Sequence, residues 1–456
     1  MQTRIEKDSM GEMRVPADAL WGASTQRAVE NFPISGRGLR RPFLRALGLI
    51  KQAAAATNLE LKDLDSKLAD VIGKAAAEVA EGKLDRHFVV DIYQTGSGTS
   101  TNMNANEVIA NRAAQLLGKP FGSRDAVHPN DHVNRGQSSN DVIPAALHVA
   151  CAEEVTRSLL PALDHLGKAL AEKARKFDPI VKIGRTHLQD ATPVRLGQVF
   201  SGFAQQVQNG IARLRHALPH LSELALGGTA VGTGINCPKG FAKKTIARVA
   251  EMTGVPFVEA PNHFEAQAAR DAAVELSGAL KTVAVSLWHI ANNIRFLGCG
   301  PRCGIGEINL PATQPGSSIM PGKVNPVMSE MLMQVAMRAI GNDAAVTAAG
   351  TTGLGELNVA IPVMADALLE SIELMTNGAR VFADQCVKGI EADEERCSEL
   401  IEKSLMLATA LVPETGYDKA AAIAKKAQEQ RKTIRQVAEE MGIKNLDKLL
   451  DVRSMT

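Results

Sequence analysis

The sequence predicts a mainly all-α fold built around a central bundle of long helices. Three observations support this prediction. The chain has 456 residues, which is enough for two or three domains and a large buried interior. Aromatic residues make up only 4% of the chain while alanine is abundant, and this balance suits closely packed helices better than sheets. Apolar residues also recur with helical periodicity over several long stretches.

The first part of the chain predicts a helical domain, which we place at residues 1–138. Residues 1 to about 40 are rich in turn formers and predict an irregular lead-in with short helices. An alanine-rich helical pattern then runs over 42–82, with a break around 58–65. A run of small polar residues at 96–104 opens a further helix.

The middle of the chain, residues 139–390, predicts the bundle. Its longest helical pattern covers 142–177, with Pro144 in the first turn and Pro161 expected to bend the helix. Helices of this length need neighbours, and their apolar content exceeds one narrow stripe, so we also expect burial against other subunits. Residues 391–456 predict a small C-terminal domain of shorter helices. Four comparable long stretches lie at 194–226, 264–297, 326–349 and 362–384.

Composition argues against several classes of function. Basic residues number 51 and acidic residues 50, so the formal charge of +1 gives no reason to expect a nucleic acid or an acidic membrane as partner. The six cysteines are scattered without a C-x-x-C pair, which favours a reducing cytoplasm and no metal site. No apolar run approaches transmembrane length and the N-terminus lacks the core of a signal peptide, so we expect a soluble, unexported protein.

Residues 316–326 combine two hydroxyls, a lysine, an amide, two glycines and two prolines, and they predict a working loop. A small anion can be bound by main-chain N–H groups, Lys323 and Asn325, while Ser317 or Ser318 is placed to react with it. A surface turn uses the same residue types, so composition alone leaves both interpretations open.

This loop does not match a phosphate-binding loop. Five residues separate Gly316 from Gly322, and Val324 rather than a hydroxyl residue follows the lysine. The spacing therefore disfavours nucleotide binding.

Two further segments place hydroxyls at predicted helix starts, where free N–H groups favour a carboxylate. Taken alone, each segment is more simply a helix cap. The candidate residues are Ser97, Gly98 and Thr99 in the first segment, and Ser138, Ser139 and Asn140 in the second.

The residues from Gly316 to Pro326 resemble, at every position, the loop of class II fumarases in the fumarase and aspartase superfamily. Members of this superfamily eliminate water, ammonia or an amine from succinate-like substrates. Residues 93–99 and the segment Gly184-Arg185-Thr186-His187-Leu188-Gln189-Asp190-Ala191 are similar to the same family, and aspartases usually carry glutamine at the position of His187. The resemblance covers essentially the entire chain.

The resemblance implies a three-domain fumarase/aspartase-like fold and the reversible hydration of fumarate to L-malate, a step of the tricarboxylic acid cycle. It assigns Ser317 as the base at carbon and His187 as the group that acts on water or hydroxyl. Lys323 and Asn325 are expected to stabilise the carboxylate. A serine hydroxyl is too weak an acid to serve unaided, so the loop must stabilise its oxyanion through backbone N–H groups.

The resemblance also implies a cofactor-free and metal-free homotetramer whose sites draw on several chains. Glu330 matches a carboxylate that orients the histidine in relatives. A secondary anion site is expected to be weak because Asp125 and Ala126 replace a basic neighbourhood. Its residues are His128, Pro129, Asn130 and Asp131, and the expected substrate-binding residues are Ser97, Gly98, Thr99, Ser138, Ser139, Asn140, Thr186, Ser318, Lys323 and Asn325.

Two alternatives remain. Aspartate ammonia-lyase shares the fold and loop, but His187, the pair Ser138-Ser139 and Gly322 speak against it, whereas residues 307–311 look somewhat aspartase-like. A non-catalytic helical scaffold is less consistent with the intact catalytic set, because a scaffold has no use for those side chains together.

Overall fold

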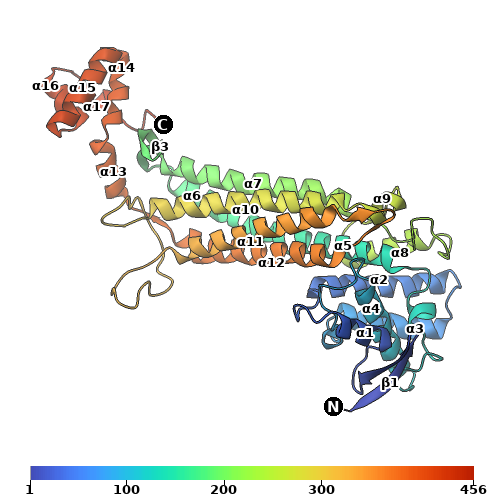
Figure 1. The fold of residues 1–456 in the computed structure, drawn as a ribbon. Coiled ribbons are helices and arrows are strands. Elements are labelled where there is room, and N and C mark those ends of the chain that lie inside the picture. Colours follow the sequence, from blue (N-terminus) through green and yellow to red (C-terminus); the bar gives the residue numbers. More distant parts are fainter. Residues whose placement is uncertain (1) are drawn as a thin grey trace. The chain divides into compact units, whose positions relative to one another are not determined.

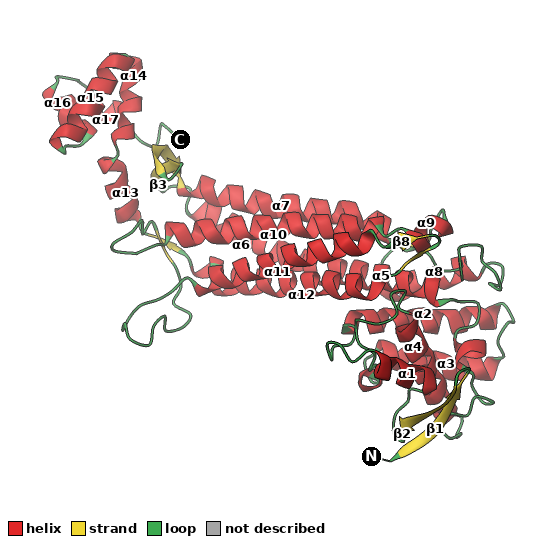
Figure 2. Cartoon of the chain, viewed as in Figure 1, coloured by secondary structure: helices red, strands yellow, loops and turns green. Residues whose placement is uncertain are grey.

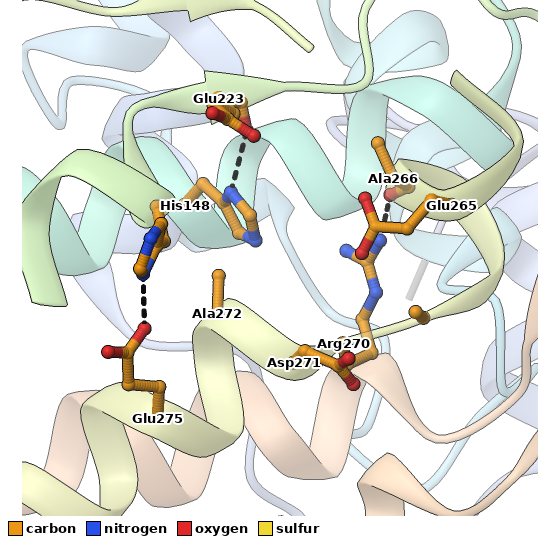
Figure 3. A pocket seen from close by; sticks show the side chains of 10 residues that line it. His148, Glu223, Glu265, Ala266, Arg270, Asp271, Ala272 and Glu275 are labelled. Carbon is orange, nitrogen blue, oxygen red and sulfur yellow. Dashed lines mark hydrogen bonds and ion pairs between the residues drawn. The ribbon is translucent and has the colours of Figure 1, made fainter. Parts of the chain in front are cut away.

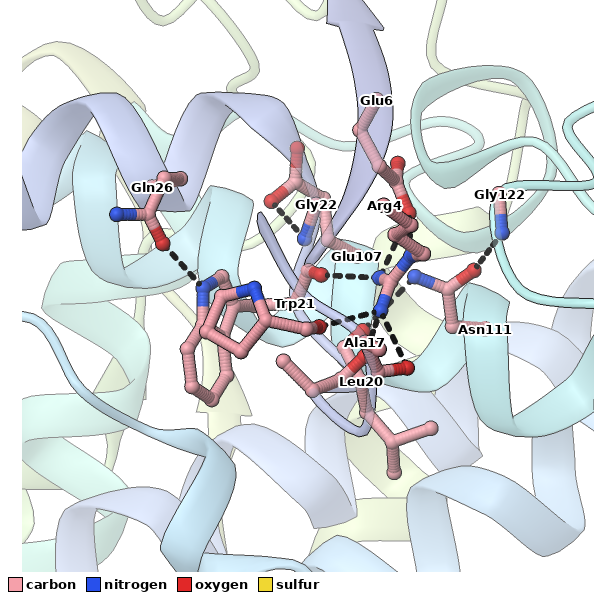
Figure 4. Close-up of polar contacts among 12 residues, drawn as sticks. Arg4, Glu6, Ala17, Leu20, Trp21, Gly22, Gln26, Glu107, Asn111 and Gly122 are labelled. Carbon is pink, nitrogen blue, oxygen red and sulfur yellow. Dashed lines mark hydrogen bonds and ion pairs between the residues drawn. The ribbon is translucent and has the colours of Figure 1, made fainter. Parts of the chain in front are cut away.

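The computed structural model describes residues 2–456, and helices dominate it (Figures 1 and 2). The chain begins with an antiparallel hairpin of β1 (Thr3–Asp8) and β2 (Gly11–Pro16). The prediction of an irregular lead-in was therefore wrong for these strands, although a short helix, α1 (Ala23–Asn31), does follow them. Contacts distant in sequence hold the hairpin. The guanidinium of Arg4 donates to the carbonyl of Ala19 at 2.7 Å and to that of Trp21 at 2.8 Å, contacts that no local pattern reveals. Figure 4 shows the bond to Trp21.

A buried carboxylate on α4 (Thr99–Leu116) fixes α1. Glu107 accepts hydrogen bonds from the backbone N–H groups of Gly22, Ser24 and Thr25 at 2.9–3.1 Å (Figure 4 draws the bond to Gly22), and from the hydroxyl of Thr25 at 2.6 Å. These are the free N–H groups of the first turn of α1, so the carboxylate also suits the positive end of the helix dipole.

The predicted pair of helices at 42–82 is confirmed as α2 (Arg41–Glu60) and α3 (Ser66–Ala80), with Asp65 capping the second. The two helices approach closely at Gly48, where a Cβ atom would lie 2.5 Å from the backbone nitrogen of Ala80. Apolar side chains of α3 and α4 form a buried core cluster in this part of the chain.

The predicted long helices are present. The longest is continuous through α5 (Ser139–Glu154), a π-helical turn η3 (Val155–Leu159) and α6 (Leu160–Lys176), so the irregularity expected at Pro161 occurs in the turn just before it. The stretch 264–297 was wrongly predicted as one helix, because the backbone becomes extended at Ala269. The remaining long helices are α7 (Leu196–Leu221), α10 (Asp271–Leu297), preceded by α9 (His263–Ala268), α11 (Val327–Gly350) and α12 (Ile361–Gln385).

The chain divides into two compact units, and the division falls within the long helices. The first unit comprises Met1–Pro161, Ala212–Ala284 and Met337–Thr376, and the second comprises Ala162–Ile211, Val285–Ala336 and Asn377–Thr456. Inside the first unit, Asp343 of α11 accepts from Ser277 of α10 at 2.8 Å. Inside the second, His165 of α6 pairs with Asp384 of α12 at 2.8 Å. The mainly all-α prediction is confirmed, whereas the three-domain division stays a prediction.

The C-terminal residues of the second unit form short helices around their own apolar cluster, which includes Leu411, Ile423 and Val437. No helix among residues 2–456 is both long enough and apolar enough to cross a membrane. The short C-terminal helices are α13 (Glu394–Lys403), η5 (Leu405–Leu411), α14 (Val412–Thr415), α15 (Tyr417–Gln430), α16 (Ile434–Glu440) and α17 (Leu446–Leu449). The elements not yet named are η1 (Asp85–His87), η2 (Pro129–Val133), β3 (Val181–Thr186), β4 (Gln189–Arg195), β5 (Glu223–Leu224), α8 (Phe241–Thr253), β6 (Val258–Glu259), β7 (Ile308–Asn309), β8 (Gly353–Leu354), β9 (Leu357–Asn358), η4 (Val387–Gly389) and β10 (Glu391–Ala392).

Candidate active site

His187 lies at the tip of the antiparallel hairpin β3–β4, in the second unit. Thr186 pairs with Gln189, so His187 and Leu188 form a two-residue turn with φ of 55° and 62°. Such turns need positive φ at both central positions and normally use Asn or Gly. The sequence does not predict this hairpin, because neither turn residue is typical of it. The imidazole of His187 is exposed and makes no hydrogen bond within residues 2–456.

A fully buried carboxylate anchors the same hairpin. Glu307 pairs with Arg185 at 2.8 Å and with Lys182 at 3.1 Å, and both cations belong to β3. Burial lowers the pKa of Lys182, while the charge of Glu307 opposes that shift. The sequence gives no local signal for these ion pairs, since Glu307 is more than one hundred residues from both cations.

The loop 316–326 is closed by its own backbone. Gly316 donates its N–H to the carbonyl of Lys323 at 2.8 Å, and the side-chain amide of Asn325 donates to the carbonyl of Gly316 at 2.7 Å. A Cβ atom on Gly316 would lie 2.4 Å from the Lys323 carbonyl oxygen, so only glycine fits. The amide of Asn325, expected to hold substrate, is therefore engaged in shaping the loop.

The hydroxyl of Ser317 is an acceptor in this loop. Its Oγ receives the backbone N–H of Met320 at 3.0 Å and that of Ile319 at 3.2 Å. Donors placed in this way stabilise a negatively charged oxygen more than a neutral hydroxyl. Ser318 and the ammonium of Lys323 are exposed, and neither side chain has a hydrogen-bonding partner in the described part of the chain.

Three hydroxyls from the two helix-start segments lie together in the first unit. Thr99 Oγ1 is 2.8 Å from Ser97 Oγ and 2.9 Å from Ser139 Oγ. The N-cap of α4 is Gly98, with φ of 74° and no side-chain bond, so neither Ser97 nor Thr99 serves as a helix cap. The structure thus brings residues 40 positions apart into one polar cluster.

The second segment is partly a cap. Ser138 is the N-cap of α5 and forms a capping box with Asp141, so its hydroxyl caps the helix, whereas its expected contact with substrate stays a prediction. Asn140 donates its amide to the carbonyl of Ala230 at 2.8 Å, which ties α5 to the glycine-rich segment 227–234.

Two ionisable side chains that the sequence does not predict to be buried, Lys51 and Asp141, lie in the interior behind this helix start. Lys51 on α2 is fully buried and donates to Asn134 Oδ1 at 2.8 Å and to Gln137 Oε1 at 3.0 Å, and its burial lowers its pKa to about 7. Asp141 accepts backbone N–H groups from residues 138, 227 and 229, while burial raises its pKa. The position of Lys51 within an apolar helical stretch was the one sequence feature that could have indicated its burial.

The predicted secondary anion site forms a single π-helical turn, η2. His128 Nδ1 accepts the backbone N–H groups of Asn130 and Asp131 at 3.2 and 3.1 Å, so the ring already occupies these donors. The carboxylate of Asp131 lies 3.2 Å from the same nitrogen, and Pro129 contributes no N–H.

Other predicted residues remain apart. Thr186 lies exposed at the end of β3, and Glu330 lies exposed on the first turn of α11. Within residues 2–456, no hydrogen bond joins His187 to Glu330 or to Ser317. The hydroxyl cluster belongs to the first unit, whereas His187 and the loop belong to the second.

A cavity of about 390 Å³ in the first unit contains none of these residues (Figure 3). His148 and Arg270 contribute to its lining, and the Nδ1–H of His148 donates to the carbonyl of Glu223 at 2.9 Å. Within the described residues no group of three or more His, Cys, Asp or Glu side chains is arranged to hold a metal ion.

Comparison with known proteins identifies the class. Residues 11–341 match a family model described as Lyase, and residues 407–456 match one described as Fumarase C C-terminus. The chain is therefore an enzyme of the lyase class.

Within that class, the chain belongs to the class II fumarate hydratase family. It is 55% identical over 436 residues to fumarate hydratase class II of Rhizobium meliloti, covering 96% of this chain and 94% of the relative. It is 54% identical over 441 residues to mitochondrial fumarate hydratase of Mus musculus, covering 96% of this chain and 87% of that relative. The crystal structure of recombinant class II fumarase from Schistosoma mansoni matches with a TM-score of 0.96 at 40% identity, covering 100% of this chain and 99% of that chain. The family and fold predicted from the sequence are confirmed.

Proposed function

We propose that the protein is a hydro-lyase that interconverts fumarate and L-malate, as in the tricarboxylic acid cycle. The observation that carries this proposal is the hydroxyl of Ser317, which accepts two backbone N–H groups inside a loop that only glycine at position 316 permits. The relatives named fumarate hydratase, at 52–55% identity, supply the substrate class.

Removal of the carbon-bound proton of malate is the difficult step, because that proton is very weakly acidic. Ser317 takes the proton as an oxyanion, and the N–H groups of residues 319 and 320 stabilise that charge before reaction. As the proton leaves, negative charge grows on the neighbouring carboxylate. The exposed ammonium of Lys323 is free to stabilise it.

His187 acts at the oxygen. Its ring is exposed and makes no hydrogen bond within residues 2–456, so the imidazole is free to activate water in hydration and to protonate the departing hydroxyl in dehydration. Glu330 orients this ring in the assembled protein. The substrate carboxylates are oriented by Asn140 and by the hydroxyls of Ser97, Thr99, Ser138, Ser139 and Thr186.

We further propose a homotetramer whose sites combine residues from several chains. Large apolar side chains are exposed beside both catalytic candidates, since Leu188 is 74% and Ile319 is 84% accessible in the single chain. Partner subunits would cover them and supply the missing half of each site. All six cysteines are free thiols, which supports work in the reducing cytoplasm.

The chemistry requires no metal or organic cofactor, so activity is expected to survive treatment with a chelator, and its loss would contradict this mechanism. We also propose that residues 128–131 bind dicarboxylates weakly or not at all. Strong dicarboxylate density beside His128 in a soaked crystal would contradict this.

The test of function follows the ultraviolet absorbance of fumarate with purified protein, first without and then with ammonium, and identifies the product. Loss of fumarate without ammonium, with L-malate as the sole product, is the expected result. Loss that requires ammonium would identify an aspartate ammonia-lyase instead, and no loss in either buffer would favour the scaffold.

A further inference from the structure

The buried ammonium of Lys51 is costly for stability. It is fully buried on α2, and its two hydrogen-bonding partners are the neutral amide oxygens of Asn134 and Gln137. No carboxylate of the described residues lies within ion-pairing distance of it. An apolar side chain of similar length avoids this desolvation penalty, so the lysine needs a reason other than stability.

The amides that Lys51 holds belong to the turn that leads into α5. Asn134 also donates its side-chain amide to the carbonyl of Gln137 at 3.0 Å, and it accepts from the amide of Asn102 on α4 at 3.2 Å. Through Asn134, the ammonium of Lys51 on α2 and the amide of Asn102 on α4 are both connected to the residues immediately before Ser138. Displacing this turn would displace the start of α5.

Asp141 provides the electrostatic reason. Its carboxylate accepts backbone N–H groups at the start of α5 and from Gly227 and Thr229, directly beside the segment 138–140 proposed to hold a substrate carboxylate. An uncompensated negative charge here would repel a dianion. Helix α2 packs against α5, so the ammonium of Lys51 is a positive charge on the element packed behind Asp141, and it opposes the effect of burial on the pKa of that carboxyl.

We propose that Lys51 is a positioning residue of the dicarboxylate site, which fixes the 134–137 turn and offsets the charge of Asp141 so that the start of α5 accepts a carboxylate. This inference rests on the proposed function, since it concerns the binding of that substrate. Lys51 itself does not touch the substrate.

The experiment compares Lys51→Met with Lys173→Met in the assembled enzyme. Lys173 is a second buried lysine, whose ammonium donates to the carbonyl of Ile390 in the second unit and makes no hydrogen bond to a candidate site residue within residues 2–456. We expect Lys51→Met to raise the KM for fumarate and the dissociation constant of succinate about tenfold, because a charge-supported carboxylate contact weakens while kcat changes little. Lys173→Met should leave both constants within about twofold of wild type.

A second variant, Gln137→Glu, remains informative if Lys51→Met fails to fold. It keeps an acceptor for Lys51, but it loses the two hydrogen bonds that the Gln137 amide donates to the carbonyls of Val133 and Arg135, and it adds a negative charge. Both changes act against carboxylate binding, so both constants should again rise. Unchanged constants in either folded variant would overturn the proposal. Calorimetry measures the binding of succinate without any turnover, so the effect of each variant on carboxylate binding is determined independently of activity. A wild-type protein that binds succinate but does not hydrate fumarate would refute the proposed function and leave the role of Lys51 testable.

Discussion

The substitution Gly316→Ala tests whether the backbone of the loop activates Ser317. The new Cβ atom would lie 2.4 Å from the carbonyl oxygen of Lys323 and 2.9 Å from the backbone nitrogen of Asn325, so the closing hydrogen bond of the loop cannot persist. Without that closure the N–H groups of Ile319 and Met320 move away from Ser317 Oγ. No catalytic side chain is removed.

Loss of one preorganised oxyanion donor costs about 10²–10³ in kcat, and Gly316→Ala is expected to displace two, so kcat for fumarate hydration should fall at least about 100-fold. The midpoint of thermal unfolding should barely change, because the loop is largely exposed.

Gly322→Ala is the matched control in the same loop. Its Cβ atom meets nothing within 4 Å, although φ is 79°, so it introduces about 1–2 kcal/mol of backbone strain without a clash. Its loss of kcat should stay below about tenfold. Steady-state hydration kinetics of both variants decide the matter, and near-normal turnover in Gly316→Ala, or equal losses in the two variants, would refute the reasoning.

Three further predictions follow from the same structure. Ser317→Ala and His187→Asn should each reduce kcat by about 10³-fold or more while sedimentation shows an unchanged assembly, and near-normal turnover would remove that residue from the mechanism. Glu307→Gln should lower the free energy of unfolding by about 3 kcal/mol in denaturant titrations, because two poorly exposed cations on β3 lose their charged partner; a change below about 1 kcal/mol would contradict this. Burial lowers the pKa of Lys51 from 10.5 to about 7, and the charge of Asp141 on α5 partly opposes this shift. Between these two pH values the unfolded chain therefore binds more protons than the folded protein does. The stability contribution of Lys51 should therefore rise with pH across that window, and a Lys51→Met protein with the same pH dependence as wild type would disprove it.

The local patterns of the sequence determined most of the fold and of the candidate list. Helical periodicity and low aromatic content were sufficient for the long helices, because a helix is specified by residues three and four positions apart. The loop 316–326 was recognisable because its combination of glycines, prolines and polar side chains is contiguous. The hairpin at His187 escaped prediction, since a two-residue turn without Asn or Gly gives no local signal.

Only the tertiary structure decided how these parts act. It placed the Ser138 hydroxyl at a helix cap and joined the hydroxyls of Ser97 and Thr99 in a cluster with Ser139, although all belong to similar sequence segments. It also paired Glu307 with cations on β3 and enclosed Lys51 beside Asp141. The physical reason is that desolvation and charge pairing depend on which distant segments pack together, and no spacing within one segment carries that information.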